Sequence, residues 1–256
     1  LYTVTCGINY YKMSFTETYG ITKEVYTTEE LYRACEILVE RMNELYDQVR
    51  RNETGEMLVS KGARREAVTA MQSLGESYEK LAGFYPLPKE LAGSWILSVQ
   101  GLTGVYSPFT VEANYNKEMT GYNQPFTMCH ELAHLKGFMQ EEEANMIGFL
   151  ACEQSEEPEF RYSSAMMGWI YCGNELYDRD KEKYQRLSEM LPKEAHKDLE
   201  ANSRFWDEHE GIISEASEKI NDAYLKANRQ EAGVESYDQV ADLIVQYLMK
   251  KETIWK

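Results

Sequence analysis

The fold is decided by residues 130–145, which read HELAHLKGFMQEEEAN. Residues four apart on an α-helix lie one above the other on the same face. His130 and His134 can therefore direct their imidazole nitrogens at a single zinc ion. Glu131 lies one step round the helix, where it can reach a zinc-bound water as a general base without replacing a ligand. The pattern predicts a helix that carries a zinc site.

A third ligand is expected downstream, after a change in chain direction. In an unbroken helix Glu141 would lie about 10 Å along the axis from His134, too far to share one ion. Gly137 can adopt backbone angles that turn the chain out of a helix. We therefore predict a reversal near Gly137 and a second helix over residues 140–153.

Three glutamates open this second helix, and helix N-termini favour acidic residues whether or not a metal is present. We take Glu141 as the third zinc ligand and Glu143 as the alternative. Asn145 follows Glu141 by four residues and shares its face. We expect the amide of Asn145 to hydrogen-bond a ligand from the second shell.

The chain resembles known metallopeptidases at these residues. Its H-E-x-x-H motif followed by Glu141 is similar to that of gluzincin-type zinc peptidases. The element E-x-x-A-N over residues 141–145 resembles the E-x-x-A-D element of the CAAX-prenyl-endopeptidase class. There the first glutamate is the third ligand and the aspartate orients a histidine. Asn145 stands in place of that aspartate and gives less electrostatic support to a ligand.

A closer resemblance covers most of the chain. It rests on residues 7–11 (GINYY), 107–114 (SPFTVEAN) and 160–163 (FRYS), together with the metal motif and its E-x-E-A-N. As a set these look like a bacterial family of membrane-anchored, zinc-peptidase-like proteins, a domain of unknown function. In that family hydrophobic N-terminal helices precede the soluble part. The resemblance implies a membrane-associated full-length protein, anchored by a segment absent from this chain, with the soluble domain extracytoplasmic.

Most of the remaining chain reads as helix. A capping box at Thr27 and Glu30 precedes an apolar stripe that ends near Arg51. Further helices are expected over residues 67–81, 163–177, 193–228 and 237–248. Neither a repeat nor a linker divides the chain. We predict a single domain over residues 1–256, of mainly α-helical α+β class, with a zincin-like active helix.

A small β element is expected immediately upstream of the active helix. Residues 94–116 are rich in Gly, Val, Tyr, Thr and Phe and fit one or more short strands. The active helix itself is expected to begin near Thr127, a suitable N-cap, with Pro125 in the chain that enters it.

Composition narrows the partners. A net charge of −16 disfavours binding to nucleic acid, which depends on a basic surface. The five cysteines include no C-x-x-C pair and predict free or buried thiols. No run of eighteen apolar residues is present to span a membrane.

The chain begins at Leu1 without an initiator methionine, so we expect it to be part of a longer protein.

A zinc hydrolase also needs a donor that stabilises the oxyanion, usually a tyrosine, histidine or arginine. We consider Arg161, Tyr162, His209 and Tyr237 as candidates for this donor. Residues of these types are more often packing or surface residues. Residues 108–116 could form an edge strand that binds an extended peptide by β-augmentation. An equally good interpretation is a turn stabilised by Glu112 and Asn114.

The sequence therefore predicts a hydrolase, a zinc-dependent metallopeptidase that cleaves a peptide or protein with a metal-activated water. Its cofactor is Zn2+, and Glu131 takes the proton and later delivers it to the leaving amine. The alternative is a non-catalytic zinc-binding sensor or interaction domain of a membrane protein, with the fourth zinc position covered. A third hypothesis has no metal at all.

Overall fold

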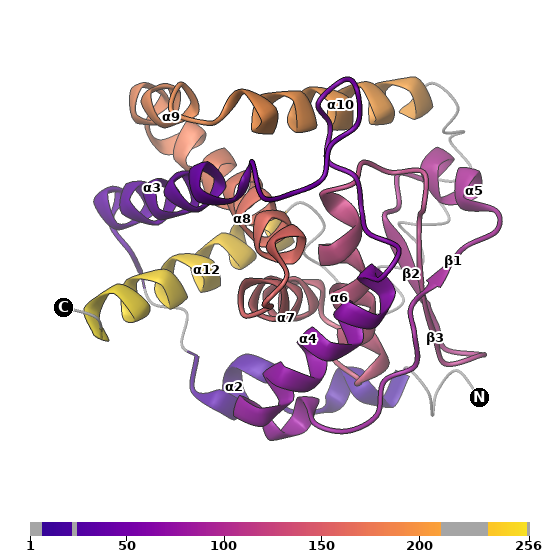
Figure 1. Ribbon diagram of the computed structural model, residues 1–256. Helices are drawn as coiled ribbons and strands as arrows, with labels where there is room; N and C mark the ends of the chain where they lie inside the picture. The colour runs from indigo at the N-terminus through magenta and orange to yellow at the C-terminus, as the bar shows by residue number, and fades with distance from the viewer. Residues whose placement is uncertain (1–6, 22–24, 211–234, 255–256) are drawn as a thin grey trace.

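The computed structural model describes residues 7–21, 25–210 and 235–254 of the chain (Figure 1). Helices make up most of these residues and one small sheet accompanies them, which confirms the predicted α+β class with mainly helical content. The elements in chain order are η1 (Gly7–Tyr11), α2 (Phe15–Tyr19), α3 (Thr28–Leu45), α4 (Ala63–Ser77), η2 (Glu79–Leu81), β1 (Lys89–Glu90), α5 (Ser94–Val99), β2 (Gly104–Ser107), β3 (Glu112–Tyr115), α6 (Asn123–Leu135), α7 (Glu141–Glu153), α8 (Pro158–Arg179), α9 (Lys181–Ser188), α10 (Lys193–Glu210) and α12 (Glu235–Ile254).

Helix α7 lies at the centre of the molecule, where Figure 1 shows it end-on among α4, α6, α8 and α12. Its residues from Met146 to Cys152 are all buried. A Cβ added at Gly148 would lie 3.4 Å from the backbone nitrogen of His130 and 3.4 Å from the carbonyl oxygen of Phe126. A methyl group at Gly148 would already be in van der Waals contact with the backbone of α6, so the two helices approach closely at this crossing. The close contact holds α7 firmly against the helix that carries the two histidines.

Helix α3 begins as its capping box predicts. The hydroxyl oxygen of Thr27 accepts a hydrogen bond from the backbone nitrogen of Glu30 at 3.2 Å, and the Glu30 carboxylate accepts one from the Thr27 nitrogen at 2.7 Å. The apolar stripe of α3 is buried and packs along α8. The helix ends at Leu45, earlier than the predicted Arg51, because the chain then turns through residues 46–49.

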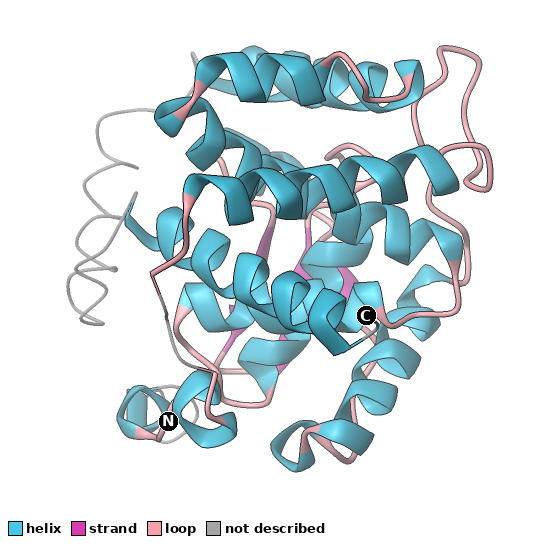
Figure 2. Cartoon of the chain, turned by 90° about the vertical axis from the view of Figure 1, so that its left-hand side faces the viewer, coloured by secondary structure: helices cyan, strands magenta, loops and turns pink. Residues whose placement is uncertain are grey.

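The sheet has three strands in the order β1-β3-β2, and β2 and β3 lie against α6. In Figure 2 the strands lie behind the helices. β3 pairs with β1 in parallel, Lys89 opposite Asn114, and with β2 antiparallel, Gly104 opposite Tyr115. β3 is thus the central strand, and the prediction that residues 108–116 form an edge strand is wrong. The unforeseen partner β1 has only two residues, too few to show an alternating pattern.

Two predicted boundaries upstream of the histidines are also wrong. Residues 94–99, expected among the strands, form helix α5. Helix α6 begins at Asn123, not near Thr127, because Pro125 occupies the first turn of the helix, where no backbone N–H is required. Thr127 is buried within α6, and its hydroxyl group faces the sulfur of Met119.

Most buried apolar side chains of the described residues belong to one large cluster, to which α3, α4, α6, α7, α8 and α12 contribute. The helix predicted over residues 193–228 is observed as α10 up to Glu210, and the rest of that range lies outside the described residues. Among the helices that are described, none is long and apolar enough to cross a membrane.

Candidate metal centre

The two helices that carry the predicted ligands are joined by a tight reversal. α6 ends at Leu135 and α7 starts at Glu141. Between them Gly137 has a φ of 94°, a left-handed conformation that residues with side chains rarely adopt. The backbone nitrogen of Phe138 then donates a hydrogen bond to the carbonyl oxygen of Ala133 at 3.2 Å. The predicted change of direction near Gly137, and the second helix after it, are confirmed.

The reversal brings Glu141 to the two histidines. Its Oε2 atom lies 3.2 Å from Nε2 of His130, and its Oε1 atom lies 3.5 Å from Nε2 of His134. Within the described residues, these three side chains are the one group of His, Cys, Asp or Glu suited to hold a metal ion, with ligand atoms within 4.8 Å of one another. Ligand atoms bound to a tetrahedral zinc ion at about 2.0–2.1 Å lie about 3.3 Å apart. The two separations between Glu141 and the histidines are close to this value, so the group could hold an ion such as zinc.

The cluster is buried on the histidine side and open on the side of Glu141. The side chains of His130 and His134 are 12% and 10% exposed, whereas that of Glu141 is 40% exposed. Burial favours neutral forms, but the mutual attraction of these groups outweighs it. The histidines hold the pKa of Glu141 well below its usual range, and Glu141 and Glu131 raise the pKa of His134 to about 9. A metal ion would have to displace the proton of His134.

His134 is oriented by the backbone. Its Nδ1 atom lies 2.7 Å from the carbonyl oxygen of Phe138, which leaves Nε2 to face Glu141. Nδ1 of His130 is buried and has no hydrogen-bond partner among the described residues. The described structure gives no hydrogen bond from Asn145 to Nδ1 of either ring, and its support of a ligand stays a prediction. Helical spacing puts Asn145 on the face of Glu141, but the reversal supplies a main-chain acceptor instead.

Glu131 carries a buried carboxylate whose Oε2 atom has no hydrogen-bond partner within the described structure. Burial raises its pKa to about 7, although the two histidines act in the opposite direction. A buried carboxylate oxygen without a hydrogen bond is costly, and a water at the metal would supply the missing partner. A Cβ added at Gly104 would lie 2.5 Å from Oε1 of Glu131. Strand β2 therefore lies directly against this carboxylate.

Glu143, the alternative ligand, is directed elsewhere. It is buried, and its Oε1 atom accepts a hydrogen bond from the backbone nitrogen of Thr16 at 3.3 Å. Burial raises the pKa of Glu143. Two residues along a helix correspond to a rotation of about 200°, so Glu141 and Glu143 point in nearly opposite directions from α7. The structure thus brings Glu141, and not Glu143, to the histidines.

No hydrogen bond or ion pair joins the cluster to the oxyanion candidates whose side chains the structure describes. The hydroxyl group of Tyr162 is buried and donates to Oδ2 of Asp198 at 2.7 Å. Nδ1 of His209 lies 2.6 Å from a carbonyl oxygen one turn earlier in α10. Arg161 is half-buried and its Nε atom has no partner among the described residues. Tyr237 lies in α12, and its side chain is outside the described residues.

Two residues that shape the site escaped the sequence analysis. Phe138 acts through its carbonyl oxygen, a group that every residue has. Gly104 acts through the absence of a side chain next to Glu131. The only signal for Gly104 is its place among strand-forming residues, where glycine often marks a close approach of another group.

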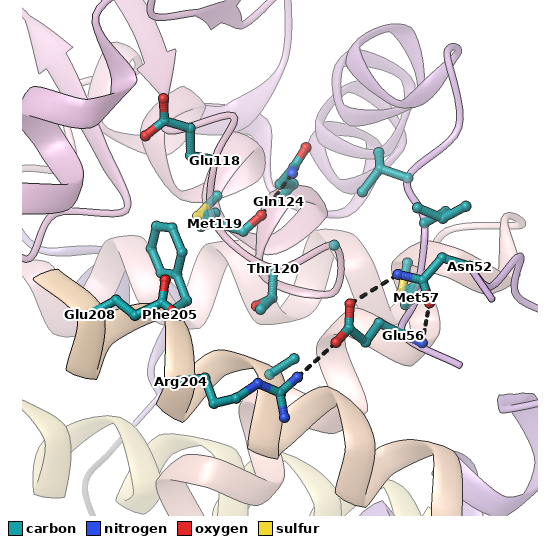
Figure 3. A pocket seen from close by; sticks show the side chains of 14 residues that line it. Asn52, Glu56, Met57, Glu118, Met119, Thr120, Gln124, Arg204, Phe205 and Glu208 are labelled. Atoms are coloured by element: carbon teal, nitrogen blue, oxygen red, sulfur yellow. Dashed lines mark hydrogen bonds and ion pairs between the residues drawn. The ribbon is translucent and has the colours of Figure 1, made fainter. Parts of the chain in front are cut away.

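A separate cavity of about 350 Å³ lies at the N-terminal end of α6 (Figure 3). It is bounded by residues 52–59, residues 118–121 and one face of α10. Arg204 of α10 and Asn52 both donate hydrogen bonds to the carboxylate of Glu56, each at 2.9 Å. None of the three side chains of the metal cluster lines this cavity, so it is a distinct feature.

Comparison with known proteins places the chain in one family. A family model described as "Protein of unknown function (DUF3810)" matches residues 1–245, almost the whole chain. Neither a curated protein nor a solved structure matches it. The match fits the resemblance to a family of unknown function, and its description names neither a metal nor a reaction. Because the match extends over far more than half of the sequence, the chain belongs to the DUF3810 family.

Proposed function

We propose that the chain is a zinc-dependent peptidase whose metal ion is held by His130, His134 and Glu141. The observation that carries the proposal is the convergence of three ligand atoms from two helices at separations that suit zinc. Two histidines and one glutamate are a ligand set of catalytic zinc sites, which keep one position open. Bound zinc would act as a Lewis acid on the scissile carbonyl group and activate a water for attack.

Glu131 supports a hydrolytic role over a purely structural one. A structural zinc site does not require an unpaired, buried carboxylate beside its ligands. Glu131 supplies such a group, with a pKa that burial raises to about 7. A carboxylate of this kind can accept a proton from water and pass it to a leaving amine at neutral pH. We assign Glu131 this role of general base and then general acid.

Strand β2 provides a surface for the peptide substrate. It lies at one edge of the sheet, and Gly104 at its start lies against Glu131. On the side away from β3, β2 pairs with no other strand of the described residues. Backbone groups along such an edge can pair with an extended peptide. We propose that the substrate adds to β2, in place of the edge predicted over residues 108–116.

The alternative function is a zinc-binding sensor or interaction domain without catalysis. One observation favours it: in the described structure no hydrogen bond or ion pair joins any of the candidate donors Arg161, Tyr162 and His209 to the cluster. Hydrolysis of an amide normally needs such a donor. By contrast, the exposed side chain of Glu141 favours the peptidase, because it leaves the cluster accessible to a substrate. Both proposals are compatible with a full-length protein that is anchored to a membrane. This anchoring rests only on the resemblance to a family of membrane-anchored proteins.

Substitution of Glu131 separates these functions. We expect the purified protein to contain about one zinc ion per chain and to cleave members of a fluorogenic peptide library until a chelator is added. Glu131→Gln should retain zinc and lose a factor of about 10²–10⁴ in cleavage rate. Glu142→Gln is the matched control, because it makes the same change in charge next to Glu141, and Glu142 does not belong to the cluster in the described structure. Zinc without cleavage in the wild type would favour the sensor domain, and a chain that does not bind zinc would contradict both.

A further inference from the structure

Three lysines line a second cavity, of about 380 Å³, on the turn between α6 and α7. Lys12 follows η1, Lys80 lies in η2, and Lys136 is the first residue after α6. Residues 137–140 of the turn and Glu143 complete that side of the lining. Three segments that are far apart in the sequence thus bring lysine side chains to one cavity.

None of these ammonium groups has a carboxylate partner among the described residues. Nζ of Lys80 donates to the hydroxyl group of Thr18 at 2.7 Å, and Nζ of Lys136 donates to the carbonyl oxygen of Ala82 at 2.7 Å. For Nζ of Lys12 the described structure gives no hydrogen bond or ion pair. Three lysines that have no carboxylate partner among the described residues, around one cavity, leave an excess of positive charge there.

Glu143 is the one carboxylate of this lining, and its charge is already engaged. The carboxylate accepts the hydrogen bond from the backbone nitrogen of Thr16 at the start of α2. It therefore faces the N-terminal segment and does not pair with any of the three lysines in the described structure.

The cavity lies on the far side of the turn from the metal cluster. Glu143 lines the cavity and points about 200° away from Glu141 around α7. Phe138 also lines it, and its carbonyl oxygen contacts Nδ1 of His134, the ring nitrogen opposite the metal-binding Nε2. A ligand in the cavity would therefore not touch a peptide bond held at the metal. The cavity is separate from the metal cluster, and ligand binding there does not depend on the proposed peptidase activity.

We propose that this cavity binds an oxyanion of the phosphate or carboxylate type between Lys12, Lys80 and Lys136. Ammonium groups form charge-assisted hydrogen bonds with such oxygens, which are stronger than bonds between neutral groups. Gln140, the residue before α7, adds an amide donor to the lining. An anion held there connects the N-terminal segment and η2 to the turn that positions Glu141.

Titration of the protein as purified with inorganic phosphate, followed by calorimetry, tests the proposal. We expect saturable binding of one phosphate per chain, weakened about tenfold by Lys12→Gln and by Lys80→Gln. Both lysines are exposed, so these variants should keep the wild-type circular dichroism and melting curve. Lys12→Arg should retain most of the binding, because it keeps the charge. Lys61→Gln is the matched control, an exposed lysine outside the cavity whose loss changes net charge equally.

Three results would overturn the proposal. One is the absence of saturable binding, and another is binding that neither cavity variant weakens, as expected for phosphate on the metal. The third is an equal loss in Lys61→Gln, which would reflect net charge alone. Co-sedimentation with phosphatidylcholine vesicles, with and without phosphatidylglycerol, then identifies the source of the anion. Pelleting that needs both phosphatidylglycerol and Lys12 assigns it to a lipid headgroup, and phosphate binding without pelleting assigns it to a soluble ligand.

Discussion

An alanine at position 104 would place a methyl group against the carboxylate of Glu131. The added Cβ would lie 2.5 Å from Oε1 and 2.8 Å from Cγ of Glu131, and 2.8 Å from Cγ2 of Thr127. Ordinary contacts between carbon atoms are about 3.5–4.0 Å, so the carboxylate or strand β2 must move by about 1 Å. Overpacking of this kind costs about 1–3 kcal/mol in the free energy of unfolding. A catalytic group misplaced by about 1 Å costs about a hundredfold in rate.

Urea denaturation and peptide hydrolysis, measured on the same preparations, give the two readouts for Gly104→Ala. We expect both the free energy of unfolding and the rate of hydrolysis to fall. The zinc content should stay complete, because the added methyl group contacts none of the three ligands. Val105→Ala is the control for stability, since its side chain is exposed on the other face of the strand. Unchanged stability and turnover in Gly104→Ala would refute the close approach of β2 to Glu131. If Gly104→Ala is less stable but the wild type does not cleave peptides, the close approach of β2 to Glu131 is supported and the peptidase function is rejected.

Three further predictions concern the turn, a buried ion pair and a buried thiol. Gly137→Ala forces a side chain into a φ of 94°, so we expect the free energy of unfolding to fall by about 1–2 kcal/mol. We also expect weaker zinc binding, measured in competition with a chromogenic chelator. Wild-type zinc affinity in this variant would contradict the role of the reversal. Asp198→Ala leaves Arg51 buried without its partner at 2.9 Å, and urea denaturation should show a loss of about 3–5 kcal/mol, larger than that of Asp198→Asn. Burial raises the pKa of Cys35 to about 12, above an unfolded value of about 8.5, so its contribution to stability is complete below pH 8.5 and is lost as the pH rises towards 12. At pH 8 a thiol reagent should label Cys35 only after unfolding, as located by mass spectrometry, and rapid labelling of the native protein would contradict this.

The part of the site that could be predicted from the sequence is the part governed by helical geometry. Spacing of four residues aligns His130 with His134, and the length of a helical rise shows that Glu141 needs a reversal to join them. Gly137 was the residue able to provide it, and its φ of 94° shows that it does. Helical spacing did not indicate that a backbone carbonyl from the turn, and not the side chain of Asn145, lies next to Nδ1 of His134.

The features that could not be predicted depend on segments that meet only in the folded chain. Lys12, Lys80 and Lys136 occur singly in the sequence, and nothing in their neighbourhoods indicates a common cavity. The central position of β3 depends on a two-residue partner that directly follows Pro88 and has no strand pattern of its own. The approach of Gly104 to Glu131 depends on how the sheet docks on α6, and local propensity does not determine this.

The hydrogen bond between His134 and the main chain of residue 138 constrains how this site can evolve. A carbonyl group is present whichever side chain stands at position 138, so substitutions among apolar residues there leave the histidine supported. An insertion or deletion between His134 and Glu141 would instead shift both the carbonyl and the carboxylate out of register. In homologues that keep the three ligands, we therefore expect the six-residue interval to vary in sequence but not in length.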